Sequence, residues 1–127
     1  MTQEQGQTIA EWINQNAERY WLSAGGPLAS RSNGGAEVIF VDDPQMPGLI
    51  PLAKKADPDR IVLFRSHIQI RSDLVATEGS PASEVWRYLW NSGIGQADLF
   101  ISHPVREFVP KDVPPSKVGY MPATTDW

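Results

Sequence analysis

The sequence contains no cysteine among its 127 residues. This absence excludes a disulfide-stabilised scaffold, a thiolate metal site and a cysteine nucleophile. An excess of basic residues is lacking too: 11 Lys and Arg stand against 15 Asp and Glu, so the formal net charge is -4. Because nucleic acids and anionic membranes are bound by basic surfaces, neither is an expected partner.

Long hydrophobic runs are also missing. No apolar stretch approaches the ~20 residues that a membrane span needs. The first residues, MTQEQGQTIAEW, have neither the basic nor the apolar region of a secretory signal, so a cytoplasmic location is expected. The length suits one domain, and a hydrophobic content of 41% is sufficient for a core.

The N-terminal part predicts one helix and a loose connection. Thr8 and Glu11 have the spacing of a capping box, and the apolar residues that follow recur at helical spacing. We therefore expect a helix over residues 9–21, with residues 1–7 frayed. Gly25-Gly26-Pro27 ends this pattern, and residues 23–36 read as a Gly- and Ser-rich connection.

Short, uninterrupted apolar runs predict the strands. None of them alternates apolar with polar residues, which is typical of strands buried on both faces of a parallel sheet. The runs cover residues 37–41, 61–64 and 99–101, with a weaker one at 118–121.

Helical patterns separate these runs. Ser80 and Pro81 are suitable first residues for a helix over residues 81–92, whereas Pro51 weakens a second helix at 47–56. Strands that alternate with helices predict an α/β fold, here a partial Rossmann-like domain of about four parallel strands. So few helices leave faces and edges of the sheet open.

The chain is interpreted as one partial domain with three parts. Residues 1–36 form the first helix and the connection, residues 37–105 form a βαβαβ core, and residues 106–127 form a Pro-rich strand and an interdomain link.

Polar side chains follow three successive strands. Ligands of open α/β sheets bind beyond the carboxyl ends of the strands. If the strands are parallel neighbours, these residues share one edge and can bind a polyhydroxylated ligand through hydrogen bonds. The three clusters are Asp42-Asp43-Pro44-Gln45, Arg65-Ser66-His67 and Ser102-His103-Pro104.

Plainer interpretations exist for each cluster. Asp-Asp-Pro is a common turn, either histidine could be structural, and Arg65 and Arg71 could form ordinary ion pairs with Asp42, Asp73 or Glu78. A zinc or iron site lacks the usual tight His spacing. No Gly-x-Ser-x-Gly or phosphate-binding glycine loop follows a strand.

Together, the motifs resemble a known family. VDDPQMP at 41–47, FRSHIQIRSDL at 64–74, FISHPV at 100–105 and VGYMPATTDW at 118–127 resemble the fungal retaining trehalose phosphorylases, also called trehalose synthases or clock-controlled-protein-like, of glycosyltransferase family 4. AEWINQNAERYWL at 10–22, and the GGPL that follows, are similar to the same family. The resemblance covers nearly the whole chain from about residue 8.

The resemblance implies a GT-B fold, with the active site between two Rossmann-like domains. It implies conversion of α,α-trehalose and phosphate to α-glucose 1-phosphate and glucose, with neither metal nor cofactor. The chain resembles the second half of the N-terminal domain. The missing C-terminal domain would supply the phosphate-binding basic pair, so we expect the fragment alone to be inactive. The resemblance does not decide whether the complete enzyme forms a homo-oligomer.

The resemblance also assigns roles to residues. His67 and Asp43 are the expected catalytic residues: Asp43 would accept hydrogen bonds from glucose hydroxyls, and His67 would face the transferred glucose. Gln45, Arg65 and His103 are expected to bind substrate. The alternatives are a stand-alone sugar-binding or interaction remnant without catalysis, and an unrelated metal-dependent hydrolase using His67, His103 and Asp43.

Overall fold

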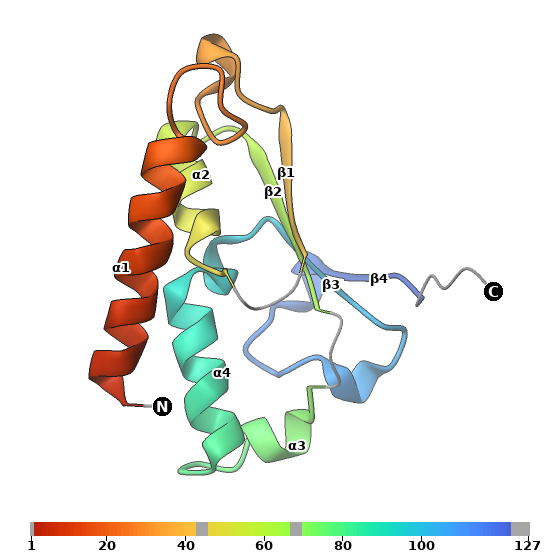
Figure 1. Cartoon of the computed structure of the whole chain (residues 1–127). Coiled ribbons are helices and arrows are strands. Elements are labelled where there is room, and N and C mark those ends of the chain that lie inside the picture. The colour runs from red at the N-terminus through yellow and green to blue at the C-terminus, as the bar shows by residue number, and fades with distance from the viewer. Residues whose placement is uncertain (1, 43–45, 67–69, 123–127) are drawn as a thin grey trace, which may run out of the picture.

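A computed structural model describes residues 2–42, 46–66 and 70–122. Its centre is one parallel sheet with the strand order β1-β2-β3-β4 (Figure 1). The predicted α/β class with parallel strands is therefore confirmed. The strands are β1 (Val38–Asp42), β2 (Ile61–Arg65), β3 (Leu99–Ser102) and β4 (Val118–Tyr120).

Within the described residues, four α-helices accompany the sheet: α1 (Gln3–Tyr20), α2 (Leu49–Ala56), α3 (Ser72–Val75) and α4 (Pro81–Ser92). Single turns of 3-10 helix occur at Arg31–Asn33, Ile94–Gln96, Arg106–Phe108 and Pro115–Lys117. The bounds of α4 match the prediction, because the Ser80 side chain accepts a hydrogen bond from the backbone N–H of Ser83 at 3.1 Å.

Helix α1 begins six residues earlier than predicted, at Gln3 rather than at residue 9. The capping box is formed by Thr2 and Gln5, which have the same spacing as Thr8 and Glu11. The Thr8 hydroxyl instead donates to the carbonyl of Glu4 at 3.0 Å, inside the helix. The prediction that residues 1–7 are frayed is therefore wrong, because the helix begins at the Thr2–Gln5 capping box rather than at the equivalent pair Thr8 and Glu11.

Helix α2 tolerates Pro51 because this residue lies in the first turn. The first N–H groups of a helix have no partner within it, so a proline there removes no hydrogen bond. The helix starts at Leu49 instead of residue 47 and ends at Ala56, as expected.

Only one face of the sheet is covered in the described part of the chain. Along β1 and β2, Val41, Val62 and Phe64 are buried, whereas Val38 and Ile61 are each 50% exposed and Phe40 is 45% exposed. Helices α1, α2 and α4 lie on the same side of the sheet (Figure 1). The apolar runs predicted burial on both faces, so this expectation is not met by the chain as described, while the predicted open faces are found.

Aromatic side chains join α4 to the covered face. The ring centroids of Phe64 and Phe100 lie 5.6 Å apart, and Trp86 of α4 meets Phe100 edge-on at 6.1 Å. Trp86 is 4% exposed, so it belongs to the core. Such pairs add about 0.5–1.5 kcal/mol each beyond the area they bury.

A buried arginine fixes the Gly- and Ser-rich connection. Arg60 is fully buried, and its guanidinium donates to four backbone carbonyls. Nη1 reaches Ala29 at 2.6 Å and Ala36 at 3.2 Å, and Nη2 reaches Leu28 at 2.9 Å and Ala53 at 2.8 Å. Burial lowers the pKa of Arg60 because it disfavours the charged form. The arginine thus ties the connection to α2 and to the start of β2.

An ion pair at the surface reinforces this junction. The Arg31 Nε lies 2.7 Å from the Asp57 Oδ2, and the Arg31 backbone N–H donates to the same oxygen at 3.2 Å. These hydrogen bonds from Arg31 lower the pKa of Asp57 from the ordinary 3.8 to about 2.

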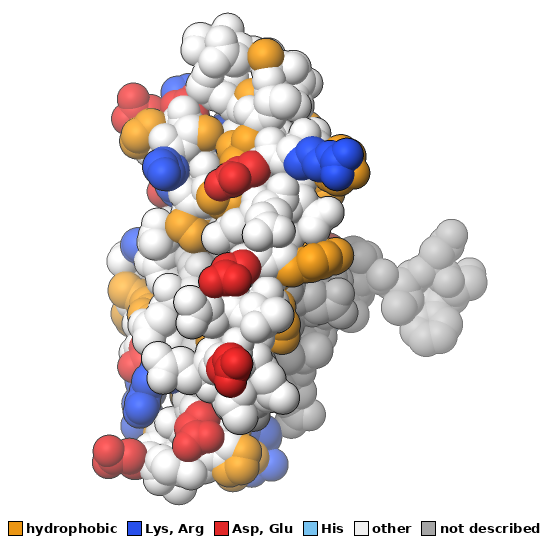
Figure 2. Space-filling view, turned by 60° about the vertical axis from the view of Figure 1, so that its left-hand side comes forward, with side chains coloured by type: hydrophobic (Ala, Val, Ile, Leu, Met, Phe, Trp, Pro, Cys, Tyr) orange, Lys and Arg blue, Asp and Glu red, His pale blue; other side chains and the backbone are white. Residues whose placement is uncertain are grey.

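The exposed side of α1 carries both acidic and apolar side chains. Glu4, Glu11 and Glu18 are exposed and lie seven residues apart, which places them on one side of the helix, and Figure 2 shows acidic side chains in a line. Ile9, Trp12 and Tyr20 of the same helix are 45%, 61% and 58% exposed. Among the helices of the described residues, none is both long enough and apolar enough to cross a bilayer.

We predict that Arg60→Met destabilises the fold by at least about 3 kcal/mol, because four backbone carbonyls lose a charged donor, in three buried hydrogen bonds and one part-buried. Urea unfolding measures this loss. Arg106→Met, at an exposed arginine, is the control and should stay within about 0.5 kcal/mol of the parent. Equal effects of the two substitutions would contradict the role of Arg60.

A second prediction concerns the dependence of fold stability on pH. The pKa of Asp57 is lower in the folded chain than its ordinary value, so the ionised carboxylate stabilises the fold above about pH 4 and this contribution is lost as the pH falls towards 2. Asp57→Asn should therefore destabilise the chain at pH 7 and progressively less on acidification. The measurement is the free energy of unfolding of both proteins between pH 7 and pH 2. A difference that does not change with pH would show that Arg31 does not favour the ionised form.

Candidate functional site

The carboxyl ends of three strands lie side by side. Asp42 pairs with Arg65 in the β1–β2 register, and Arg65 pairs with Ile101 in the β2–β3 register. Ser66 and Ser102, the next residues along this edge, are both 2% exposed. The backbone N–H of Ser66 donates to the Ile101 carbonyl at 2.8 Å. The described strand ends therefore share one edge, as the parallel arrangement predicts.

An arginine and an aspartate face each other at this edge. The Arg65 Nη1 lies 3.8 Å from the Asp42 Oδ2, and the two side chains are 11% and 42% exposed. At this distance the contact is an ion pair without a short hydrogen bond. Both residues lie on the uncovered face, in line with Phe40 and Leu63. The pairing of Arg65 with Asp42, which the sequence allowed as an ordinary ion pair, is thus found.

Three of the five predicted site residues, Asp43, Gln45 and His67, lie outside the described residues. The fourth, His103, follows β3 and is half-buried; its backbone carbonyl accepts a hydrogen bond from the N–H of Val105 at 2.6 Å. Arg65 and His103 therefore come from neighbouring strands of the same edge. The convergence of Asp43, His67 and His103 stays a prediction.

Arg71 belongs to a surface ion pair. Its Nε and Nη2 lie 2.9 Å and 2.6 Å from the two carboxylate oxygens of Asp73, and both side chains are more than half exposed. The hydrogen bonds raise the pKa of Arg71 and lower that of Asp73. This contact is the ordinary ion pair that the sequence allowed.

Metal ligands do not gather in the described part of the chain. Within residues 2–42, 46–66 and 70–122, no three His, Asp or Glu side chains lie close enough to hold an ion. The metal alternative depends on His67 and Asp43, which are outside these ranges.

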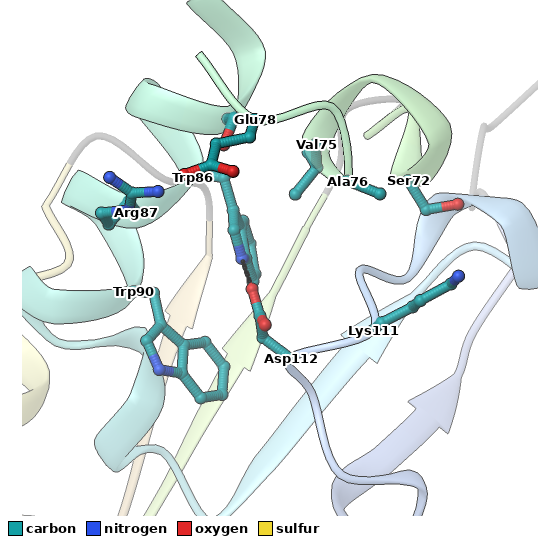
Figure 3. Close-up of a pocket in the computed structure, with 10 residues that line it drawn as sticks. Ser72, Val75, Ala76, Glu78, Trp86, Arg87, Trp90, Lys111 and Asp112 are labelled. Atoms are coloured by element: carbon teal, nitrogen blue, oxygen red, sulfur yellow. Dashed lines mark hydrogen bonds between the residues drawn. The ribbon is translucent and has the colours of Figure 1, made fainter. Parts of the chain in front are cut away.

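A cavity that the sequence did not predict lies beside the sheet. It has a volume of about 660 Å³ and lies between α3, α4 and the segment that leads to β4. Figure 3 shows the indoles of Trp86 and Trp90, with Asp112 at the tip of the Trp86 indole and Lys111 farther across the cavity. Carboxylates, cations and aromatic rings meet there, so the cavity offers donors, acceptors and flat apolar surface to a small polar molecule.

The link that shapes this cavity is a hydrogen bond across the chain. The Trp86 Nε1 donates to the Asp112 Oδ2 at 2.9 Å. No local pattern could have revealed it, because the two residues are far apart in sequence and Asp112 lies in a Pro-rich stretch with no periodicity. The only available signal was the indole itself, which finds a hydrogen-bond acceptor when buried.

Comparison with known proteins gives consistent matches. Residues 1–110 match the family described as "Trehalose synthase, N-terminal domain". The chain is 57% identical over its full 127 residues to the trehalose phosphorylase of Pleurotus pulmonarius and 54% identical to that of Grifola frondosa. It covers only 16% and 17% of those proteins. No solved structure matches the chain.

Removal of this acceptor should destabilise the packing of α4. We predict that Asp112→Ala destabilises the chain by about 1 kcal/mol, because the indole N–H of the buried Trp86 loses its partner in a part-buried hydrogen bond. Asp112→Asn keeps an acceptor oxygen and should recover most of the loss. Urea unfolding gives the energies, and the indole N–H resonance of Trp86 should shift in Asp112→Ala. An unchanged resonance would mean that this hydrogen bond is absent in solution.

Proposed function

Because the chain belongs to the family of the trehalose synthase N-terminal domain, we propose that it forms part of a retaining trehalose phosphorylase. The identity of 54–57% over the whole chain to proteins named trehalose phosphorylase is the observation that carries this proposal. The chain spans about one-sixth of the length of these relatives. The activity is therefore proposed for a protein of family length, and the 127-residue chain alone is expected to be inactive.

The proposed reaction transfers one glucose of α,α-trehalose to inorganic phosphate. The glycosidic C–O bond breaks, and a new bond forms between the anomeric carbon and a phosphate oxygen. The departing glucose takes up the proton that the attacking phosphate gives up, so the products are glucose and α-glucose 1-phosphate. Attack on the face from which glucose departs retains the configuration. Such a transfer passes through an oxocarbenium-like state and depends mainly on positioning and electrostatic stabilisation.

The strand edge supplies the sugar-binding groups in this proposal. Asp43 follows β1 directly in the sequence and would accept hydrogen bonds from glucose hydroxyls, together with Gln45. His67 follows Ser66 and would contact the transferred glucose. Arg65 and His103 come from neighbouring strands and would complete the contact with the sugar. The phosphate and the missing C-terminal domain are the further partners of this site.

Hydrolysis is the less suitable reaction for these residues. Glycosidases use two carboxyl groups that flank the scissile bond. Asp42 and Asp43 are adjacent in sequence, so at most one of them is expected to face the sugar. The carboxylate of Asp42 already faces the guanidinium of Arg65. One carboxylate at most is then left for the sugar, which favours transfer to phosphate.

The proposed function also assigns parts of the chain to domains of the complete enzyme. We assign residues 37–105 to the core of a GT-B N-terminal domain and residues 106–127 to the link towards the second domain. The strand edge would face that domain, so that the sugar lies between the two. A cytoplasmic location agrees with phosphate and a sugar phosphate as reactants.

The test is a chimera in which these 127 residues replace the segment they match in the Pleurotus pulmonarius protein. The chimera should release α-glucose 1-phosphate from trehalose and phosphate. His67→Ala in this chimera should lower kcat/KM by about 100-fold or more, because a transition-state contact of ~3 kcal/mol is lost. Phosphorolysis rates and the melting temperature of each variant are measured.

Gln15→Ala, on the outer side of α1, is the matched control and should leave the rate unchanged. The 127-residue chain alone is the negative control. A folded chimera without activity would show that this chain does not carry a competent site. A rate of His67→Ala close to that of the parent would remove His67 from the mechanism.

A further inference from the structure

The cavity between α3, α4 and the segment before β4 takes no part in the proposed reaction. Its volume of about 660 Å³ lies within the range of about 300–1,000 Å³ that is typical of small-molecule sites. Among the described residues, neither Arg65 nor His103 lines it. Its wall residue Trp86 packs on the covered face of the sheet, whereas the side chains of Asp42 and Arg65 lie on the uncovered face. The cavity is therefore a separate place from the strand edge.

Two indoles form an apolar surface in this cavity. Trp86 is buried and Trp90 is half-buried, and both line the cavity. Their ring centroids lie 5.7 Å apart at an interplanar angle of 37°, so the two rings contact each other. They leave no slot between them into which a flat ligand could insert. A ligand in the cavity would therefore meet aromatic surface on one of its sides only.

Four charged side chains surround this apolar surface: Glu78, Arg87, Lys111 and Asp112. Two are acidic and two are basic, so their formal charges cancel. Within the described residues they form no ion pair with one another. Asp112 accepts the indole N–H of Trp86 through Oδ2, which leaves Oδ1 as an acceptor. The cavity thus offers both donors and acceptors to a ligand.

This combination fits a neutral pyranose. A pyranose has C–H groups on one face of its ring and hydroxyl groups around its edge, so it can cover one indole and form hydrogen bonds with both signs of charge. An anion would need an excess of basic groups, which the cavity does not have. A nucleobase has two flat apolar faces, of which these indoles could cover only one. We infer that this cavity is a second carbohydrate site, distinct from the strand edge, that binds a neutral pyranose.

The positions of the side chains define how the sugar lies. Its C–H face packs on Trp90, Lys111 donates to hydroxyl groups and Asp112 accepts from them. Figure 3 shows Arg87 on the α4 side of the cavity and Lys111 on the other side, so donors stand on both sides of the ring. A sugar in this position joins α4 to the segment that leads to β4. Because only the folded chain forms this site, bound sugar stabilises the fold.

The inference goes beyond the proposed function and does not depend on catalysis. Its first test is a titration of the ¹⁵N-labelled chain with glucose or α,α-trehalose, followed through the indole N–H resonances. The signals of Trp86 and Trp90 should shift and saturate at millimolar sugar. The signal of Trp12, which is exposed on α1, should not move. Adenosine and inorganic phosphate are the comparison ligands and should have no effect.

Substitutions separate the cavity from the strand edge. Lys111→Met should weaken sugar binding by about fivefold or more, because a charged donor to the sugar is lost. Arg106→Met is the matched control, since Arg106 is an exposed cation of the same segment and does not line the cavity. Trp90→Ala should abolish the shifts. If Trp90→Ala does not fold, the exposed Lys111 decides. His103→Ala should leave the dissociation constant unchanged.

Three results of the titration would overturn the inference. The first is the absence of a saturable shift at Trp86 and Trp90. The second is a shift with adenosine or phosphate but not with sugar, because the ligand would then belong to another class. The third is loss of the shifts in His103→Ala, because the sugar would then be bound at the strand edge.

The Pleurotus pulmonarius chimera tests the cavity in a protein of family length. Acetylation of lysines by an N-hydroxysuccinimide ester is measured by mass spectrometry, with and without trehalose and with phosphate left out. Trehalose should slow the reaction of Lys111 but not that of Lys55, which is exposed on α2. A Lys111 that is unreactive without sugar would overturn the inference, because other residues would then fill the cavity.

The same chimera distinguishes this inference from the proposed function. An inactive chimera in which trehalose protects Lys111 supports the second site and contradicts the proposed function. An active chimera in which trehalose leaves the reactivity of Lys111 unchanged does the reverse.

Discussion

The structure depends on one constraint: four parallel strands follow one another across the sheet in the order of the chain. Each connection between parallel neighbours is right-handed, so all helices between the strands come to one face. The same constraint brings the carboxyl ends of β1, β2 and β3 to one edge. The position of the candidate site and the exposure of the opposite face are therefore two consequences of a single topology.

Polar side chains with distant partners hold this arrangement where apolar packing is sparse. The Gly- and Ser-rich connection contributes little core, and Arg60 compensates by binding carbonyls of this connection and of α2. Asp112 does the same for the Pro-rich segment before β4 by accepting from Trp86. In both cases one side chain satisfies backbone or indole groups that would otherwise be costly to bury. Irregular segments are thereby fixed without secondary structure of their own.

Much of this fold could be predicted from the sequence, because local signals agree with it. The uninterrupted apolar runs predicted the four strands of the described residues, and Ser80-Pro81 predicted both bounds of α4 correctly. The start of α1 was misplaced because Thr2-Gln5 and Thr8-Glu11 offer two caps of equal spacing. The roles of Arg60 and Asp112 were out of reach, since their partners are distant in sequence and carry no motif. Of the candidate site, Arg65 with Asp42 is found at the expected edge.

The ion pair of Asp42 and Arg65 connects the two surfaces that the topology creates. Its residues end β1 and β2, so they belong to the edge where a sugar would bind, yet their side chains lie on the uncovered face. The Arg65 side chain is only 11% exposed although it lies on this face. Partial removal from water strengthens the attraction between the two charges, so the pair closes the apolar surface of β1 and β2 at the end where the strand edge begins.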